Sequence, residues 1–528
     1  MEVERHLGRS DFVDDDPRTI FIGEKRLDRV LEEKGFGWVL RMRALMESLD
    51  YRLLTSRYSR LGRRPYHPRT LLSLILFGAL TRQFSLRDLE ELSAVHVGAW
   101  WLCGGNEIDH STIGKFIVLH QEALSDEFFV ALTARILKEL GIKSGVTGID
   151  GTVMEAASSR FSALRAEAVS ALAAEAKERA AAEPGDAEAQ REAETAAALE
   201  TALEERQAQR ESQRKDASTV TVVSTEPEAV VQPRKDGAKR PGYKVSAMAH
   251  EEGFVVGQHT DPSSETASVP ALIGQHRAIF EGEAPPTMLA DAGYFSLSML
   301  REATEQGIDF LCPAGQTFEW SGEWEKKPDH ELFPKTAFEY DAERDVYRCP
   351  AGETLGPLGK GRDRNLEYRQ YGTGRCASCA LRPQCTRSRD GRRIKRYEGE
   401  EYKEGMRQVL ANPRARRMYR KRMWIVEPIF AVFREHFGFR RFRRRGLSGV
   451  RAETGLFSMA LNVKRALTHR AAARARWGRA LAHIEALWNV LARLWALRAP
   501  VANLSALWGA WRSWTAQVTI RSKALAAN

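Results

Sequence analysis

The chain has 528 residues, of which 43% are hydrophobic and 28% are charged. This composition is typical of a folded globular protein and excludes a wholly disordered chain. No run of 18 apolar residues is present, which excludes a transmembrane helix. Six cysteines are too few for a disulfide-rich secreted scaffold, and the first residues contain no apolar stretch of a secretory signal. We therefore expect a soluble cytoplasmic protein of about three domains.

The positive charge of the chain is concentrated in one segment. The formal net charge is +10, and residues 414–445 alone contain twelve Lys and Arg against two acids, Glu427 and Glu435. This segment therefore carries as much excess positive charge as the whole chain. A local basic stripe of this kind is typical of proteins that bind a polyanion such as nucleic acid.

Residues 1–140 are predicted to form an all-α N-terminal domain. One segment has apolar residues at helical spacing, namely Leu72, Ile75, Leu76 and Ala79. Ser85 and Asp109 are predicted to begin two further helices, because their side chains can cap the free N–H groups of a first turn. Several short helices joined by turns are compatible with a DNA-binding domain of the helix-turn-helix kind.

A strand and a segment of low complexity follow. Residues 145–155 contain Val and Ile between glycines, which predicts a strand ending in a turn, with Asp150 at its end. Alanine makes up 18 of the 50 residues in 161–210, and Pro184 interrupts the run near its middle. We expect an inserted helical hairpin over 160–216, which acts as a solvated spacer or as an arm that binds a partner or dimerises.

From residue 218 onward, strands and helices alternate. Strands are predicted over residues 220–224, 242–250, 253–261, 286–291 and 308–311. Helices are predicted over residues 267–280 and 296–306. This order predicts a mixed sheet with helices on its faces. The strand over 286–291 also ends in an acid, Asp291.

Three segments complete the chain. Residues 312–400 hold five of the six cysteines and are predicted to be a small, irregular, β-rich insertion. Residues 404–470 return to helix. The tail, 471–528, contains six of the twelve tryptophans. Its apolar stripe, which includes Trp488 and Trp495, predicts a helix that packs on the body or on another subunit, with binding to a membrane surface as the alternative.

Three acids could serve one catalytic site. Asp150 and Asp291 lie at the ends of predicted strands, and Glu427 lies in a helix among arginines. Carboxylates at the ends of neighbouring strands can meet at one edge of a sheet, and a helix packed over that edge can add a third. Cleavage or transfer of a phosphodiester needs an activated nucleophile and a stabilised leaving oxygen, which two carboxylate-bound Mg²⁺ ions provide. An Asp at a strand end can equally be a turn-forming residue, so its position alone leaves both interpretations open.

Short motifs accompany these acids in a fixed order. They are IDGTVMEA (149–156), STEPEA (224–229), GYKVSA (242–247), LADAGYFS (289–296), YRCP (347–350), CASCALRPQC (376–385) and YRKRMWIVEPIFAVFREHFGFRRFRRRG (419–446). Two more precede them, YHPRTLLSLILFGALTRQFSLRDLEE (66–91) and DHSTIGKF (109–116). On these motifs the chain resembles bacterial insertion-sequence transposases of the DDE type, over roughly residues 15–470. The branch with an InsH-like N-terminal domain is the most similar.

The resemblance implies an α/β catalytic domain over residues 141–470. Its fold would be an RNase H-like mixed sheet with helices on its faces, interrupted by the helical insertion and the Cys-rich insertion. The resemblance also implies cleavage and joining of DNA that depend on two Mg²⁺ or Mn²⁺ ions. The catalytic acids that it implies, which would bind these ions, are Asp150, Asp291 and Glu427.

The family also carries a Tyr-Arg-Glu-Lys signature around the third acid. Tyr419, Arg422, Glu427 and Arg434 stand in these places. The sequence departs from the signature twice, because Arg434 replaces the lysine and four residues rather than three separate Arg422 from Glu427. Arginine keeps the positive charge and can bind phosphate through two hydrogen bonds. The resemblance implies that Tyr419 stacks on or orients the DNA end and that the two arginines stabilise backbone phosphates.

A run of five arginines follows the third acid in the motif FRRFRRRG. Such a run is often only a solvated face, but five positive charges in six positions beside the proposed site favour contact with DNA phosphates. These residues are Arg440, Arg441, Arg443, Arg444 and Arg445. Tyr243, on a predicted strand, is expected to be a core residue rather than a catalytic one.

Four cysteines have the spacing C-x26-C-x2-C-x5-C. Four thiolates suit tetrahedral Zn²⁺, and a loop-rich insertion has too little apolar surface to hold itself together. A reduced cluster without metal and a redox site are the alternatives. The candidate zinc ligands are Cys349, Cys376, Cys379 and Cys385. Cys103 and Cys312 are expected to be buried singly.

The sequence therefore predicts a DNA transposase that cuts insertion-sequence ends and joins them to target DNA. Its partners would be double-stranded DNA, at terminal inverted repeats and at the target, and a second copy of the chain, since two ends must be cut together. It would be associated with the nucleoid when bound to DNA. Two alternatives remain open: a catalytically silent DNA-binding regulator derived from a transposase, and a metal-dependent nuclease that cuts without joining.

Overall fold

The computed structural model describes residues 11–58, 62–212, 216–234, 237–313, 332–363 and 366–469. Nearly all of them belong to one compact unit, Met1–Arg465, and only residues 466–469 belong to a second unit, Ala466–Asn528. The predicted Trp-rich tail lies outside the described residues. Among the helices that the structure describes, none is long and apolar enough to cross a membrane. The domain boundaries proposed from the sequence stay predictions.

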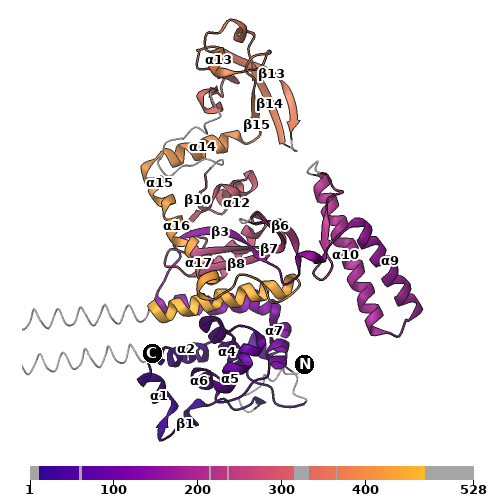
Figure 1. The fold of residues 1–528 in the computed structure, drawn as a ribbon. Coiled ribbons are helices and arrows are strands. Elements are labelled where there is room, and N and C mark those ends of the chain that lie inside the picture. Colours follow the sequence, from indigo (N-terminus) through magenta and orange to yellow (C-terminus); the bar gives the residue numbers. More distant parts are fainter. Residues whose placement is uncertain are drawn as a thin grey trace, which may run out of the picture. The chain divides into compact units, whose positions relative to one another are not determined.

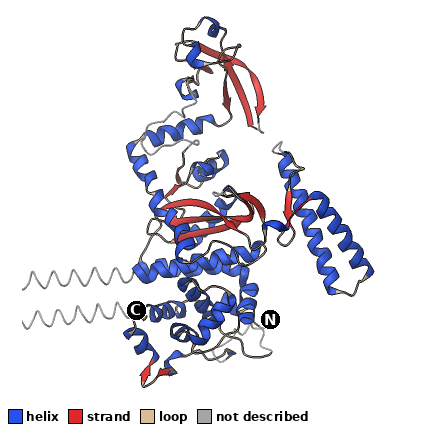
Figure 2. Ribbon diagram, viewed as in Figure 1, coloured by secondary structure: helices blue, strands red, loops and turns tan. Residues whose placement is uncertain are grey.

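The first part of the chain is a bundle of helices (Figures 1 and 2). These are α1 (Leu27–Glu33), α2 (Gly37–Glu47), α3 (Arg52–Thr55), α4 (Pro68–Thr81), α5 (Leu86–Val95), α6 (Val97–Cys103), α7 (His110–Ser125) and α8 (Glu127–Leu140). Helix α4 is buried on all sides from Thr70 to Ala79, as expected for a helix that is apolar all round. It contacts α2, α5, α6 and α7, so the bundle is built around it.

Both predicted helix starts are confirmed. The Ser85 hydroxyl accepts a hydrogen bond from the N–H of Asp88, and the Asp88 carboxylate accepts one from the N–H of Ser85. This reciprocal pair is a capping box. At the start of α7, the Asp109 carboxylate accepts hydrogen bonds from the N–H groups of Ser111 and Thr112.

The prediction that this domain is all-α is wrong at one short segment. Strands β1 (Phe21–Ile22) and β2 (Lys25–Arg26) form an antiparallel hairpin. Gly23 begins the turn with a φ of 61°, a conformation that glycine adopts without steric cost. Two-residue strands are too short to show the alternating pattern by which strands are recognised in a sequence.

A six-stranded mixed sheet follows. Its strands are β3 (Val146–Glu155), β6 (Val230–Pro233), β7 (Lys239–His250), β8 (Val255–Asp261), β9 (Thr287–Leu289) and β10 (Asp309–Leu311). The order is β10-β9-β3-β7-β6, with β8 also paired to β7. Strand β9 is parallel to β3 and β10, whereas β7 is antiparallel to β3, β6 and β8. The predicted mixed sheet is thus confirmed.

Helices pack on this sheet. Helix α11 (Val269–Ile279) contacts β8, and α12 (Leu297–Glu305) contacts β10. A helix covers residues 447–469, and its part up to Arg465 lies between the sheet and the N-terminal helices (Figure 1). Its Asn462 amide donates hydrogen bonds to the Thr133 hydroxyl of α8 and to the Val255 carbonyl of β8. The N-terminal helices and the sheet therefore share this helix as a common packing element.

The alanine-rich segment is a helical hairpin, as predicted. Its helices are α9 (Ala166–Ala182) and α10 (Ala187–Ser212), and the break between them contains Pro184. Strands β4 (Ala163–Arg165) and β5 (Thr221–Val223) pair at its base. The hairpin buries one cluster of larger apolar side chains and one of alanines only: Val169, Leu199, Leu203, Val220 and Val222, and Ala173, Ala176 and Ala196. Its role as a spacer or an arm stays a prediction.

The cysteine-rich segment forms a five-stranded antiparallel sheet. Strands β11 (Glu339–Asp341), β12 (Val346–Arg348), β13 (Thr354–Asp363), β14 (Leu366–Gly372) and β15 (Ile394–Tyr397) pair in chain order. A small core of aromatic and aliphatic side chains lies against it: Phe338, Tyr347, Leu355, Tyr371 and Ile394. The prediction of a β-rich segment is confirmed, but the prediction of irregular structure is wrong. The glycines and Pro357 of β13, where the register shifts, hide the strand pattern in the sequence.

Short helices lead from this sheet to the last long helix. They are α14 (Glu400–Ala411), α15 (Pro413–Arg420), α16 (Arg422–Ile425), α17 (Glu427–Ala431) and a π-helical turn, Val432–His436. The prediction of helix over 404–470 is wrong for residues 437–446, which are not helical. Gly438 and Gly446 adopt φ of 67° and 75°, and such residues end helices. Residues 437–446 are called the arginine loop below.

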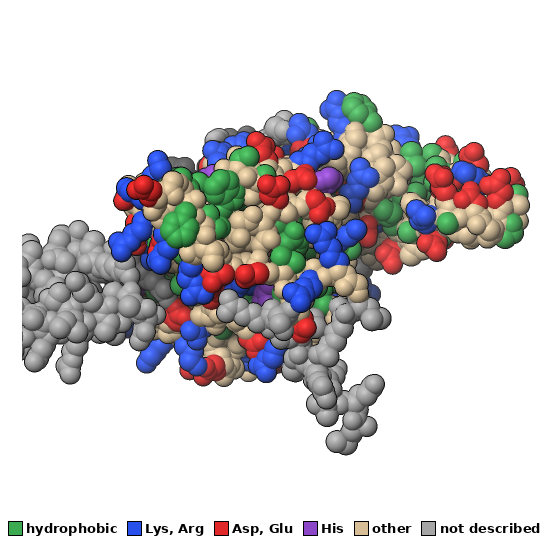
Figure 3. All heavy atoms as spheres, turned by 90° about the horizontal axis from the view of Figure 1, so that it is seen from below, with side chains coloured by type: hydrophobic (Ala, Val, Ile, Leu, Met, Phe, Trp, Pro, Cys, Tyr) green, Lys and Arg blue, Asp and Glu red, His purple; other side chains and the backbone are tan. Residues whose placement is uncertain are grey.

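Charges of both signs are mixed on the face of the molecule in Figure 3, where Lys and Arg side chains alternate with Asp and Glu. Such a mixture is ordinary for a protein surface. Composition on this face therefore does not mark a binding surface, and the site has to be located from the geometry of particular residues.

Candidate active site

Asp150 lies within β3, and Asp291 lies nearby, two residues after the end of the neighbouring parallel strand β9. Strands β3 and β9 pair Gly148 with Leu289, and each aspartate follows its paired residue by two positions. The pairing brings the two residues close together, and both carboxylates lie within 4 Å of the same nitrogen of Arg422. The Asp291 carboxylate also accepts a hydrogen bond from the N–H of Gly293, at 2.9 Å. The prediction that Asp150 ends its strand is wrong, because β3 continues to Glu155 and Asp150 pairs with Ala247 of β7. Asp291 does follow the end of its strand, as predicted.

Glu427 reaches the same region from a helix packed on β3. Gly148 makes the close packing possible, because a Cβ atom there would lie 3.2 Å from Ile425 Cγ2 and 3.3 Å from Val426 Cβ. Ile425 and Val426 are buried. Glu427 follows them as the first residue of α17, and its side chain is 50% exposed.

Arg422 joins the three acids. One terminal nitrogen of its guanidinium lies 3.1 Å from Asp150 Oδ1 and 3.9 Å from Asp291 Oδ2. The other lies 3.7 Å from Glu427 Oε1. The three carboxylates therefore surround a position that a positive charge occupies, and the donor set there consists of the hard oxygens that Mg²⁺ prefers.

The electrostatics at Asp150 reflect this crowding. Burial raises the pKa of Asp150, the positive charge of Arg422 opposes this rise, and the charges of Asp291 and Glu265 add to it. Glu265 precedes α11 and forms an ion pair of 3.0 Å with Lys244. No sequence motif singles out Glu265, because only the fold brings its segment beside β3. A cation among these carboxylates would favour their ionised forms.

Two other residues of the predicted signature flank the acids. Tyr419 is half-buried, and burial raises its pKa to about 12, with the neighbouring charges of Asp291 and Asp150 contributing to the rise. Arg434 is half-buried and donates a hydrogen bond to the hydroxyl of Thr152, two residues after Asp150 on β3. The fold thus brings Tyr419, Arg422 and Arg434 to the acids.

Models of two protein families match this chain. The family described as "Transposase DDE domain" matches residues 348–467, and the family described as "Transposase domain (DUF772)" matches residues 32–118. The chain is similar to DDE transposases over these two segments. No curated protein matches it. This similarity supports an enzyme of the transposase class.

The two family matches cover separate parts of the chain and leave the segment between them unmatched. The DDE match includes Glu427 and the basic segment, and the other match includes the end of α1, helices α2 to α6 and part of α7. Neither match reaches Asp150 or Asp291. Catalytic roles for these two residues therefore rest on the register of β3 and β9 and on their shared contact with Arg422.

The five arginines of the transposase's arginine loop differ in their surroundings. Arg440 is exposed and forms an ion pair of 2.7 Å with Glu435. The Arg441 guanidinium donates hydrogen bonds to the carbonyl groups of Ala156, Ala157 and Ser158. Arg443 lies over the ring of Phe84, 5.6 Å from its centroid. Arg444 is half-buried, and Arg445 is exposed.

Two buried carboxylates hold the backbone of this loop. Glu453 is 0% exposed and accepts hydrogen bonds from the N–H groups of Arg443 and Arg444, at 2.9 and 3.1 Å. Burial raises the pKa of Glu453 to about 7. Glu226 is 1% exposed and accepts from the N–H of Gly446, at 3.3 Å. Sequence reasoning missed both residues, because acids in a sequence do not show whether they are buried.

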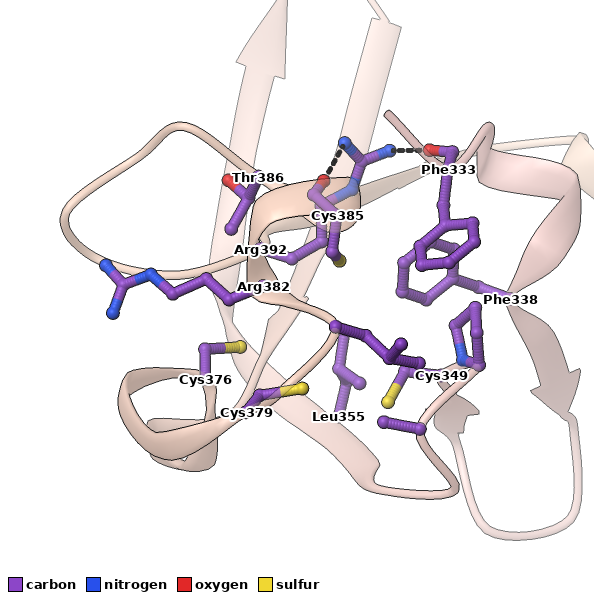
Figure 4. A pocket seen from close by; sticks show the side chains of 13 residues that line it. Phe333, Phe338, Cys349, Leu355, Cys376, Cys379, Arg382, Cys385, Thr386 and Arg392 are labelled. Atoms are coloured by element: carbon purple, nitrogen blue, oxygen red, sulfur yellow. Dashed lines mark hydrogen bonds between the residues drawn. The ribbon is translucent and has the colours of Figure 1, made fainter. Parts of the chain in front are cut away.

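The four predicted zinc ligands line one small cavity (Figure 4). The cavity has a volume of about 30 Å³. Burial raises the pKa of Cys385, and the neighbouring thiols of Cys376, Cys349 and Cys379 add to the rise. The Arg392 guanidinium fixes one side by donating hydrogen bonds to the carbonyl groups of Cys385 and Phe333.

In the described part of the chain, neither the cysteines nor the acids are arranged as a ready metal site. Among the described residues, no three His, Cys, Asp or Glu side chains stand close enough together to hold a metal ion. At the acids, the guanidinium of Arg422 lies in between.

Three predictions about single residues are confirmed. Cys103 and Cys312 are fully buried and are not paired in a disulfide. Tyr243 is fully buried, and its hydroxyl donates a hydrogen bond of 2.8 Å to the carboxylate of Glu226. Tyr243 therefore supports one of the two carboxylates that hold the arginine loop.

Proposed function

We propose that this transposase cuts DNA at the ends of its insertion sequence and joins those ends to target DNA, with Asp150, Asp291 and Glu427 as the catalytic acids. The observation that carries the proposal is that all three carboxylates lie within 4 Å of the single guanidinium of Arg422. They come from three segments far apart in the chain. Turn-forming or surface acids have no reason to meet in this way.

We propose further that the mixed sheet is an RNase H-like core. Three features support this: the order of its strands, the single antiparallel strand between β3 and β8, and the parallel pairing of β3, β9 and β10. The helical hairpin and the cysteine-rich sheet would then be insertions between the catalytic acids. The first follows β3, and the second lies between β10 and α14.

In this mechanism the three acids would hold two Mg²⁺ or Mn²⁺ ions, which activate the attacking hydroxyl and stabilise the leaving oxygen. The rest of the work is positioning and charge stabilisation by the chain's own residues. Arg434, held by Thr152 next to Asp150, would bind a phosphate near the bond that breaks. Tyr419 would orient the DNA end, and the exposed Arg445 would bind the backbone further along.

The partners would be double-stranded DNA and a second copy of the chain. The N-terminal helices would recognise the terminal inverted repeats, because their family match is also to a transposase domain. Both ends of an element have to be cut together, so a dimer on DNA would be the active form. Because the protein would neutralise DNA phosphates and release their counterions, we expect its affinity for DNA to fall steeply as the salt concentration rises.

Zinc would hold the cysteine-rich sheet together. The support is that Cys349, Cys376, Cys379 and Cys385 line one cavity of about 30 Å³, about the volume that one water molecule occupies in the liquid. A sheet with only five residues in its core has little apolar surface to stabilise it. Small movements of these side chains would bring four thiolates into a tetrahedral arrangement, which structural zinc prefers.

A cleavage assay tests the proposed function. The substrate is DNA that carries the element's own ends, with Mg²⁺ or Mn²⁺ present, and the variants are Glu427→Gln and Glu435→Gln. Glu435 is the matched control, because it lies in the same basic segment but pairs with Arg440 rather than with Arg422. The proposal expects cutting at the end boundary by wild type and by Glu435→Gln, and none by Glu427→Gln.

Other outcomes would replace the proposal. Binding without cutting by every protein would identify a catalytically silent regulator. Cutting without joining of pre-cut ends to target DNA would identify a metal-dependent nuclease. Equal cutting by wild type and Glu427→Gln would remove Glu427 from the active site.

A further inference from the structure

We propose that Arg422 occupies the cation position among the three acids while the protein is free of metal, and that its guanidinium has to leave before metal ions bind. This inference rests on the proposed function, since it concerns the same three carboxylates. It assigns to Arg422 a task beyond binding phosphate. Arg422 would control when the acids become available to metal.

The contacts of the acids carry this inference. Within the described residues, Arg422 is the only cationic residue that forms an ion pair with Asp150, Asp291 or Glu427. One guanidinium, with a single positive charge, is thus the shared partner of three carboxylates. Oxygens that bind Mg²⁺ lie about 2.0–2.1 Å from the ion, whereas these lie 3.1 to 3.9 Å from the nitrogens of Arg422. The guanidinium thus stands between the carboxylates at distances longer than metal–oxygen bonds, and the described residues contain no group of three such side chains that could hold a metal ion.

The surroundings of Arg422 show that little else holds it. Its side chain is 13% exposed, and its Nε is buried without a hydrogen-bond partner among the described residues. The one hydrogen bond that the described part of the chain gives its guanidinium is the bond to Asp150. A guanidinium that leaves this position therefore gives up mainly its attraction to the three carboxylates, which a metal ion would replace.

Electrostatics make the two cations mutually exclusive. Arginine keeps its positive charge at every pH relevant to proteins, so it cannot make room by losing a proton. A divalent ion a few ångströms from a fixed positive charge is strongly repelled. We expect removal of this charge to tighten metal binding by about tenfold or more.

This arrangement couples metal binding to DNA binding. The guanidinium that leaves the acids needs another anion, and a backbone phosphate is the one that the substrate brings. DNA would therefore favour metal binding by drawing Arg422 away, and metal would favour DNA binding by releasing Arg422. Protein without DNA would bind metal weakly.

The test measures Mn²⁺ binding to the full chain without DNA, by isothermal titration calorimetry and by electron paramagnetic resonance of free Mn²⁺. The variants are Arg422→Gln, Arg422→Met and the charge-preserving Arg422→Lys, each checked for its fold by circular dichroism. Arg417→Gln is the matched control, since it removes an exposed arginine of the neighbouring helix α15. We expect Mn²⁺ to bind about tenfold or more tightly to Arg422→Gln and Arg422→Met, and with near wild-type affinity to the other two.

Two results would overturn the inference. Unchanged or weaker Mn²⁺ binding by folded Arg422→Gln and Arg422→Met would mean that Arg422 does not occupy the metal position. Tighter binding by Arg417→Gln to the same degree would mean that general charge, rather than the position of Arg422, sets the affinity. Asp150→Asn separates this inference from the proposed function. If Asp150→Asn weakens Mn²⁺ binding while the Arg422 variants have no effect, the proposed function stands and only the inference falls.

Discussion

The buried carboxyl group of Glu453 should make the stability of this protein depend on pH. Glu453 lies in the helix over residues 447–469 and accepts hydrogen bonds from two backbone N–H groups of the arginine loop. Burial raises its pKa from the usual 4.5 to about 7, although those hydrogen bonds and the charges of Arg443 and Arg444 oppose the rise. The ionised form is therefore less favourable in the folded protein than in the unfolded chain.

The sign and size of the effect follow from proton linkage. Between pH 4.5 and 7 the folded protein holds a proton on Glu453 that the unfolded chain has lost, so the free energy of unfolding falls as pH rises through this window. The difference between the two pKa values corresponds to about 3 kcal/mol. At pH values above the upper pKa, the free energy of unfolding is lower by this whole amount. At pH values below the lower pKa, none of it is lost.

Glu453→Gln removes the titration but keeps an oxygen that can accept a backbone hydrogen bond. We expect the unfolding free energy of the variant, relative to wild type, to increase by about 3 kcal/mol between about pH 4.5 and about pH 8. Urea denaturation followed by circular dichroism at both pH values measures this difference. The surface variant Glu435→Gln, compared in the same way, should follow wild type. A difference between Glu453→Gln and wild type that stays constant with pH would refute the argument.

Three further predictions concern the site and its surroundings. Asp150→Asn should abolish DNA cleavage and leave DNA binding in a gel-shift assay intact, and equal loss of both would remove Asp150 from catalysis. About one zinc ion per chain should co-purify with wild type and be lost in Cys376→Ser, as measured by elemental mass spectrometry, and metal-free protein of unchanged thermal stability would exclude the cysteine site. Arg441→Ala should lower stability by about 1–3 kcal/mol, because it leaves carbonyl groups of residues 156–158 without their donor, and an unchanged melting temperature would contradict this.

Local sequence patterns predicted the features that depend on local chemistry. Ser85 and Asp109 cap helices as expected, because a cap is decided within three or four residues. Asp291 follows the end of β9, where a hydrophobic run stops, and a run of apolar residues is a local signal. The same reasoning ended the strand at Asp150 too early, because β3 continues to Glu155. The helical hairpin followed from alanine content and from Pro184. These predictions needed no knowledge of which segments meet in space.

The parts that the sequence could not predict depend on contacts between distant segments. Arg422 and Asp150 are 272 positions apart, and only the packing of α16 on β3 through Gly148 brings them together. Glu265 lies beside the acids because the chain turns toward β3 before α11. The role of Glu453 depends on its burial, which the sequence does not show. In each case a charged side chain looks in the sequence like any of the 70 acids or 80 basic residues. Its partner and its burial give it a particular role.

Contacts within the protein also limit how many arginines of the basic segment can bind DNA. Of the five arginines in the arginine loop, Arg440 is paired with Glu435 and Arg441 is bound to backbone carbonyl groups, while Arg444 is half-buried beside Glu453. An arginine that is already bound within the protein is not available to neutralise a DNA phosphate. Binding of the loop should therefore release fewer counterions from DNA than its five positive charges suggest.

The salt dependence of DNA binding tests this expectation. Each phosphate contact contributes about 0.9 to the slope of the logarithm of the binding constant against the logarithm of the salt concentration. Arg445→Ala should therefore reduce that slope by about one, and Arg441→Ala should leave it unchanged. Equal reductions by both variants would show that the loop rearranges on DNA and that its contacts in the free protein do not decide which arginines bind phosphate.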